Sequence, residues 1–135
     1  MSTIPNKAPS RQNPFDGTFV AGAAFTIGSE TSNTINVSVQ LRTGPNDLYD
    51  PGHVTAYLSD SANGSDIVAT APSGGWAIGT NGLLIPVVAN KAAIFVSEAN
   101  GVFDVTLTET GADTFYLVLN LPDGSQVISD AITFA

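Results

Sequence analysis

The chain has 135 residues, of which 43% are hydrophobic and 12% charged, and its formal net charge is −8 at pH 7. This length predicts a single domain, and the absence of cysteine excludes disulfides and thiolate metal sites. The acidic balance argues against binding to nucleic acid or to an anionic membrane. The sequence shows neither a transmembrane run nor a signal peptide. The lack of cysteine fits a protein made in the cytoplasm.

Residues 1–17 are predicted to form an extended N-terminal arm. Pro5, Pro9 and Pro14 each fix φ and remove a backbone donor, which disfavours both helix and central strand. Residues 1–29 carry a net charge of +1, whereas residues 30–135 hold two basic residues against eleven acidic ones. The arm is therefore the only net-positive part of the chain.

The arm contains candidate contacts to a partner, in the form of apolar anchors and basic side chains. A segment of this composition can also be a disordered tail, because chain termini are often loose. A purely solvating tail would not need the apolar side chains, which favours docking. The predicted partner-binding residues are Ile4, Lys7, Arg11, Phe15 and Phe19.

Residues 18–135 are predicted to form a β-domain of about eight or nine strands. Residues 34–41 alternate cleanly between apolar and polar side chains, which is typical of a half-buried strand. Asn-Gly pairs at 63–64, 81–82 and 100–101 are tight-turn signals. Strands are expected at 19–27, 34–41, 53–58, 67–71, 83–88, 92–97, 102–108, 114–121 and 126–134, with a strand or bridge at 76–78.

This spacing of short strands, without helical periodicity, predicts an all-β fold. We expect an Ig-like antiparallel β-sandwich, in architecture only, since the Cys and Trp signature of antibody domains is missing. A jelly roll or a small barrel is the alternative.

The sequence offers little catalytic chemistry. His53 is the single histidine and no nucleophile elbow accompanies it, so we expect no catalytic residue and no enzyme. Residues 60–66 hold two carboxylates around a turn but do not match an EF-hand, and turn chemistry explains them better than Ca²⁺. Asp104 and Glu109 are interpreted as solubilising charges. We therefore predict no metal and no cofactor.

Four segments resemble sequences of small structural proteins of tailed bacteriophages. They are TINVSVQL at 34–41, VTAYLSD at 54–60, APSGGWAIGT at 71–80 and TFYLVLNLPDG at 114–124. The resemblance implies a virion protein, specifically a capsid decoration (cement) protein on the capsid surface. Its implied partners are the major capsid protein or other virion proteins, with a homo-oligomer expected and neither nucleic acid nor membrane involved.

Two other functions are open at this stage. One is a tail, neck or fibre component in which the domain stacks into a ring or trimer. The other is a host-surface or carbohydrate-binding module that uses Trp76, Tyr49 and Tyr57 as stacking platforms.

Overall fold

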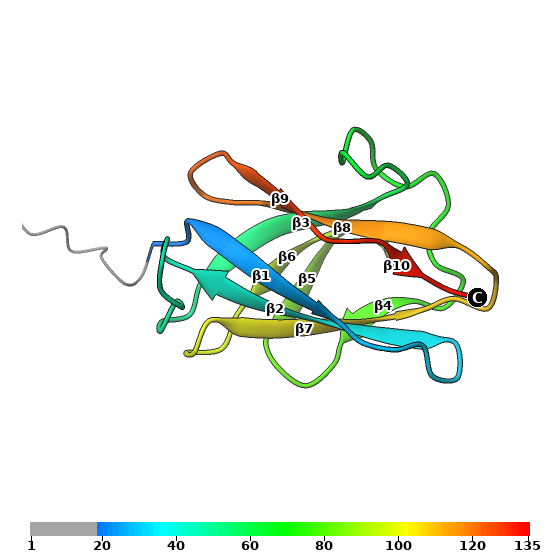
Figure 1. The fold of residues 1–135 in the computed structure, drawn as a ribbon, viewed down its shortest axis with the longest axis horizontal. Coiled ribbons are helices and arrows are strands. Elements are labelled where there is room, and N and C mark those ends of the chain that lie inside the picture. The colour runs from blue at the N-terminus through cyan, green and yellow to red at the C-terminus, as the bar shows by residue number, and fades with distance from the viewer. Residues whose placement is uncertain (1–18) are drawn as a thin grey trace, which may run out of the picture.

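The computed structural model describes residues 19–135, which form two antiparallel sheets packed as a sandwich (Figure 1). The four-stranded sheet has the order β1-β2-β7-β4, and the six-stranded sheet has the order β10-β8-β3-β6-β5, with β9 pairing β8. The strands are β1 Gly22–Ile27, β2 Thr34–Arg42, β3 His53–Ser59, β4 Gly75–Ile78, β5 Leu83–Val88, β6 Ala92–Val96, β7 Val102–Thr108, β8 Thr114–Asn120, β9 Gln126–Ile128 and β10 Ile132–Thr133. The predicted all-β sandwich is confirmed, and neither sheet closes into a barrel.

The two sheets share the spatial strand order of an immunoglobulin sandwich, with β1-β2-β7-β4 at the positions of A-B-E-D and β10-β8-β3 at those of G-F-C. The connections differ, because the chain forms β5 and β6 in the other sheet between β4 and β7, whereas D and E are consecutive in immunoglobulin domains. The remaining strands, β6 and β5, extend the second sheet beyond β3. β4 and β5 are edge strands of the two sheets, and they lie on the same side of the sandwich because they contact each other.

The core follows the period-two pattern of the central strands. Alternate apolar side chains of β2, β3, β7 and β8 point between the sheets and are buried. In the middle of the core the ring of Phe95 stacks on Phe103 with centroids 4.7 Å apart. Burial of these apolar side chains is the main stabilising contribution to the fold.

Two predicted strands differ from the structure. Residues 67–71 form no strand and belong to the long loop between β3 and β4, where Val68 is buried and its N–H donates a single hydrogen bond to Leu58 O. The predicted strand 126–134 is divided into β9 and β10. The interruption falls at Ser129, whose hydroxyl accepts a hydrogen bond from Leu117 N and donates one to Asp130 O.

The N-terminal arm lies outside the described residues, and so do its boundary at 17/18 and the predicted contacts Ile4, Lys7, Arg11 and Phe15. The described chain begins with Phe19, which is exposed, and Val20, which is buried beside Gly52. Among residues 19–135 no helix is long and apolar enough to cross a membrane.

Candidate binding surface

An apolar face lies on the outside of the six-stranded sheet, at the β5 end. Leu83 is paired with Val96, and Ile85 with Ile94, so these side chains point to the same side. Leu83 is 62% exposed and Ile85 is 47% exposed. We define the apolar face as the outward side chains of β5 and β6, namely Leu83, Ile85, Val88, Ile94 and Val96.

The apolar face ends against polar neighbours on β3. His53 is paired with Val96, and Thr55 with Ile94, and both β3 residues are exposed. An apolar patch with a polar rim is typical of an interaction surface on an otherwise soluble protein.

Strand β5 is a poor template for adding another strand at its edge. Pro86 has no N–H, and the pairing register with β6 shifts between Pro86 and Val88, which marks a bulge. Both features are devices that block edge-to-edge pairing. We infer that the side chains of the apolar face, and not its backbone edge, are available for contact.

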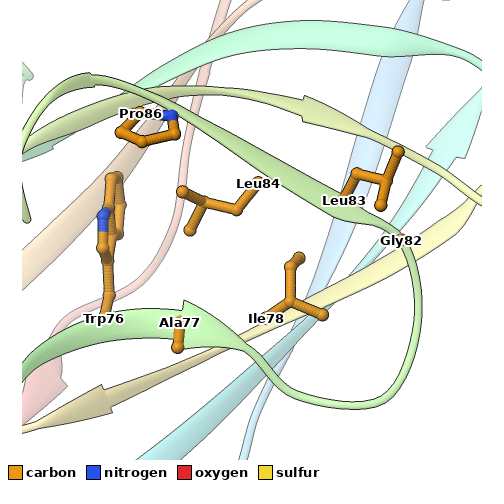
Figure 2. A pocket seen from close by; sticks show the side chains of 7 residues that line it. All are labelled: Trp76, Ala77, Ile78, Gly82, Leu83, Leu84 and Pro86. Carbon is orange, nitrogen blue, oxygen red and sulfur yellow. The ribbon is translucent and has the colours of Figure 1, made fainter.

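An open groove of about 400 Å³ runs between β4 and β5 beside this face. Figure 2 shows Trp76 and Ile78 on β4 pointing toward Leu84 and Pro86 on β5. The lining is Trp76, Ala77, Ile78, Gly82, Leu83, Leu84 and Pro86. These side chains carry no charge, and the only polar side-chain atom among them is the indole nitrogen of Trp76. The groove therefore suits apolar contact better than the orientation of a substrate.

The tryptophan does not offer an open stacking platform. Trp76 is only 8% exposed, and its ring meets Phe95 edge to face with centroids 5.4 Å apart. Tyr57 is half-buried and donates its hydroxyl proton to Gly64 O, which leaves Tyr49 as the exposed member of the three predicted platforms. Trp76 is thus a core residue that closes the open side of the sandwich.

Asp104 holds the loop that leads into β5. Its carboxylate accepts hydrogen bonds from the backbone N–H groups of Thr80 and Asn81, at 3.0 and 2.6 Å, and from Asn36 Nδ2 at 2.8 Å. Burial would raise the pKa of Asp104, but the hydrogen bonds from Asn81, Asn36 and Thr80 together outweigh it and lower that pKa. The prediction that Asp104 is a solubilising charge is wrong, because the residue is buried. The loop that buries it is distant in the sequence, so the local pattern did not reveal the contact.

Glu109 holds the segment that precedes β4, as Asp104 holds the segment that follows it. Its carboxylate accepts hydrogen bonds from the N–H groups of Gly111 at 2.7 Å and Ser73 at 3.0 Å, and these bonds lower its pKa. Glu109 is buried, so the expectation of a solubilising charge is wrong here as well. The two carboxylates fix the segments before and after β4 and so position one wall of the groove.

The turn at residues 60–66 uses its carboxylates for backbone and side-chain hydrogen bonds. Asp60 accepts from Ala69 N at 3.0 Å, and Asp66 accepts from the Ser59 hydroxyl at 3.3 Å. Within residues 19–135 no three His, Asp or Glu side chains gather as a metal site would require. His53 lies exposed at the start of β3, in the polar rim of the apolar face.

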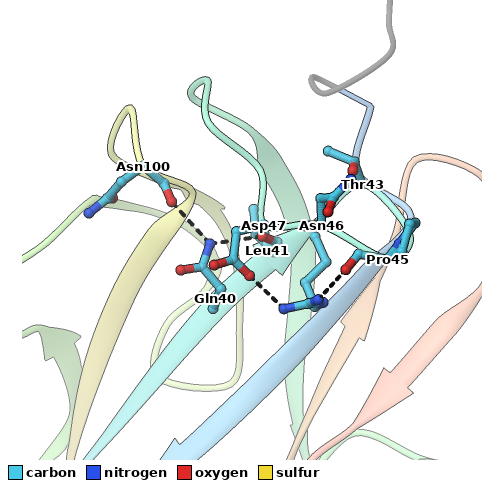
Figure 3. Close-up of polar contacts among 8 residues, drawn as sticks. Gln40, Leu41, Thr43, Pro45, Asn46, Asp47 and Asn100 are labelled. Carbon is cyan, nitrogen blue, oxygen red and sulfur yellow. Dashed lines mark hydrogen bonds and ion pairs between the residues drawn. The ribbon is translucent and has the colours of Figure 1, made fainter.

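Arg42, the last residue of β2, contacts the β2–β3 connection. Its guanidinium pairs with the Asp47 carboxylate and donates to Pro45 O at 2.6 Å. The neighbouring Gln40 amide donates to Leu41 O and to Asn100 O (Figure 3), which ties the end of β2 to the β6–β7 turn. These contacts order the end of the sandwich from which the chain enters β1.

No protein-family model matches the chain, and a search of the curated proteins found no relative. The fold and the apolar face are therefore the features of this chain that bear on its function.

The sequence prediction missed the apolar face, although residues 83–88 carry its signal. The segment Leu-Leu-Ile-Pro-Val-Val has no polar residue, so one of its two faces must expose apolar side chains unless another layer covers it. Of the predicted contacts, the structure describes Phe19 alone, which is exposed at the start of the described chain.

Proposed function

We propose that this chain is a non-enzymatic structural protein of a larger assembly, and specifically a capsid decoration protein of a tailed bacteriophage. The observation that carries the proposal is the apolar face, where Leu83, Ile85 and Val88 are exposed together on an edge of a sandwich. Exposed apolar area of this kind lowers the solubility of a free protein, and a binding partner removes that cost. The phage assignment itself depends on the resemblance of residues 34–41, 54–60, 71–80 and 114–124.

The chemistry of the buried carboxylates supports a binding role over catalysis. Asp104 and Glu109 both have lowered pKa values because backbone N–H groups donate to them. A general acid or base working near neutral pH needs the opposite shift for a carboxyl group. These two groups hold loops in place, which is a structural task.

The N-terminal arm has a complementary part in this proposal. Lys7 and Arg11 would pair with acidic patches on neighbouring shell subunits, while Ile4, Phe15 and Phe19 would anchor on apolar ones. Two linked contacts raise the effective concentration of each for its own site. A protein that binds only the assembled shell stabilises that shell by mass action.

The proposal is tested by co-sedimentation of the full chain with purified capsid shells of the phage that encodes it. We expect the wild-type chain to pellet with shells and to be released by added salt, and a Lys7→Glu, Arg11→Glu variant to bind more weakly with a shallower salt dependence. The control is Ala62→Glu, Ala112→Glu, which adds negative charge at exposed positions outside the arm and outside the apolar face. A wild-type chain that stays in the supernatant at every shell concentration contradicts the proposal, and binding to tails but not shells favours the tail or neck alternative.

A further inference from the structure

We propose that the apolar face binds a second copy of this chain, so that two six-stranded sheets pack face to face about a two-fold axis. The inference deepens the proposed assembly role by naming the partner of this face. Dimerisation is measured on the isolated protein. The dimer can therefore be absent while shell binding is observed, and shell binding can be absent while the dimer forms.

The geometry of β5 favours face packing over strand addition. Pro86 and the bulge beside it disfavour an edge-to-edge continuation of the sheet, whereas Leu83, Ile85 and Val88 remain exposed on the face. Two sheets with apolar sides toward each other pack as the layers of a sandwich do. A two-fold axis lets the same patch serve both partners.

The distribution of charge favours a second copy as the occupant. Residues 30–135 carry −9, so two copies repel each other over most of their surfaces. The segments 83–90 and 92–97 contain no charged residue, which makes the apolar face the place where copies approach without that penalty.

The charges that flank this face are opposite and lie at its two ends. Lys91 precedes β6, and Glu98 follows it by two residues. When β6 of one copy runs antiparallel to β6 of the other, Lys91 of each copy comes to the end that holds Glu98 of its partner. The two-fold arrangement thus forms two complementary charge pairs at the rim.

The size of the face predicts a weak dimer. The apolar face spans two strands about 4.8 Å apart and about five residues long, which is a flat area of roughly 160 Å². A standard stable interface buries about 800 Å² on each partner. We therefore expect a dimer that dissociates on dilution in the micromolar range or above.

Sedimentation velocity of the full chain over a range of concentrations tests this interface. The average mass should rise from that of one chain toward that of two as concentration increases. Ile85→Thr should weaken dimerisation by about tenfold or more, because the symmetry removes the apolar contact twice. The matched control is Ile67→Thr in the β3–β4 loop, since Ile67 is 48% exposed and Ile85 47%, and it should leave the dissociation constant unchanged.

A charge exchange provides a second, independent readout. Lys91→Glu and Glu98→Lys should each weaken the dimer by about three- to tenfold, since each places like charges at two symmetric sites. The double variant should restore wild-type affinity. Both side chains also make internal hydrogen bonds, to Ala69 O and from Gly82 N, so far-UV circular dichroism must first show an unchanged fold.

Three results would overturn the inference. The first is a chain that remains monomeric at every concentration reached. The second is a dimer that Ile85→Thr does not weaken. The third is a dimer that an Ile4→Ser, Phe15→Ser variant abolishes while Ile85→Thr leaves it intact, which would assign the contact to the N-terminal segment.

Discussion

The carboxylate of Asp104 on β7 accepts a 2.6 Å hydrogen bond from the backbone N–H of Asn81, in the loop that leads into β5. Asp104 belongs to the four-stranded sheet and β5 to the six-stranded sheet. One side chain therefore fixes the point at which the chain passes between the sheets, two residues before Leu83. The position of the apolar face depends on this contact.

Replacing Asp104 with asparagine should weaken the hydrogen bonds that hold the loop between β4 and β5. The amide retains one acceptor oxygen, but its NH₂ group faces N–H donors and leaves at least one of them unpaired. We expect a loss of about 1–3 kcal/mol in the free energy of unfolding. Urea denaturation measures it, with the exposed Asp130→Asn as the control. Equal midpoints for the two variants would show that the carboxylate does not hold the loop.

Acid should destabilise the fold through the same groups. The pKa values of Asp104 and Glu109 lie below their ordinary values of 3.8 and 4.5, so the folded chain binds protons less readily than the unfolded chain. The stabilisation is complete above the ordinary values and is lost as the pH falls through the lowered ones. Thermal unfolding followed from neutral pH downward should show a plateau and then a decline that begins near pH 4.5.

A Glu109→Gln variant provides the control for this acid transition. It cannot gain a proton at that site, so its unfolding midpoint should vary less with pH than that of the wild type. Identical pH profiles for the two proteins would show that Glu109 does not contribute to the acid destabilisation.

Gly79 should not tolerate a side chain. A Cβ at this position would lie 2.1 Å from Asp104 Oδ2 and 2.7 Å from Asn36 Nδ2, so one of the groups must move. We expect Gly79→Ala to cost about 1–3 kcal/mol, the usual range for overpacking. Gly22→Ala is the matched control, because the nearest atom to its new Cβ is 3.8 Å away. The cost of Gly79→Ala should shrink in an Asp104→Ala background, and strict additivity would argue against a direct clash.

Trp76 is the single tryptophan of the chain and should report on core packing. Its burial predicts a fluorescence maximum that moves to longer wavelength on unfolding, together with loss of the Phe95 contact. Trp76→Phe should lower stability by about 1–2 kcal/mol, because the edge-to-face pair and part of the buried area are lost. Glycan-array binding that is present in the wild type and lost in this variant, with the fold retained, would instead support the carbohydrate module.

The local pattern of the sequence predicted much of the sandwich. The alternation of Ile35, Val37 and Val39 against polar neighbours identifies β2 and its buried face without any tertiary information. Residues 67–71 misled the prediction because Ile67 and Val68 have strand propensity, whereas the long loop uses only Val68 as a buried anchor.

The binding surface was harder to predict because it depends on strand order. Residues 83–88 are recognisable as a strand and Pro86 favours an edge position, but no local pattern says which face of this strand stays uncovered. Asp104 shows the same limit, since its partners Thr80 and Asn81 approach it only after both sheets have formed. Long-range pairing decides both features.

Quantitative mass spectrometry of purified phage particles from the host that carries this gene tests the proposed function most directly. We predict that the chain is present in a fixed ratio to the major capsid protein, at a copy number comparable to that of the shell subunits. A chain that is absent from purified particles and found only in the soluble fraction of infected cells would contradict it.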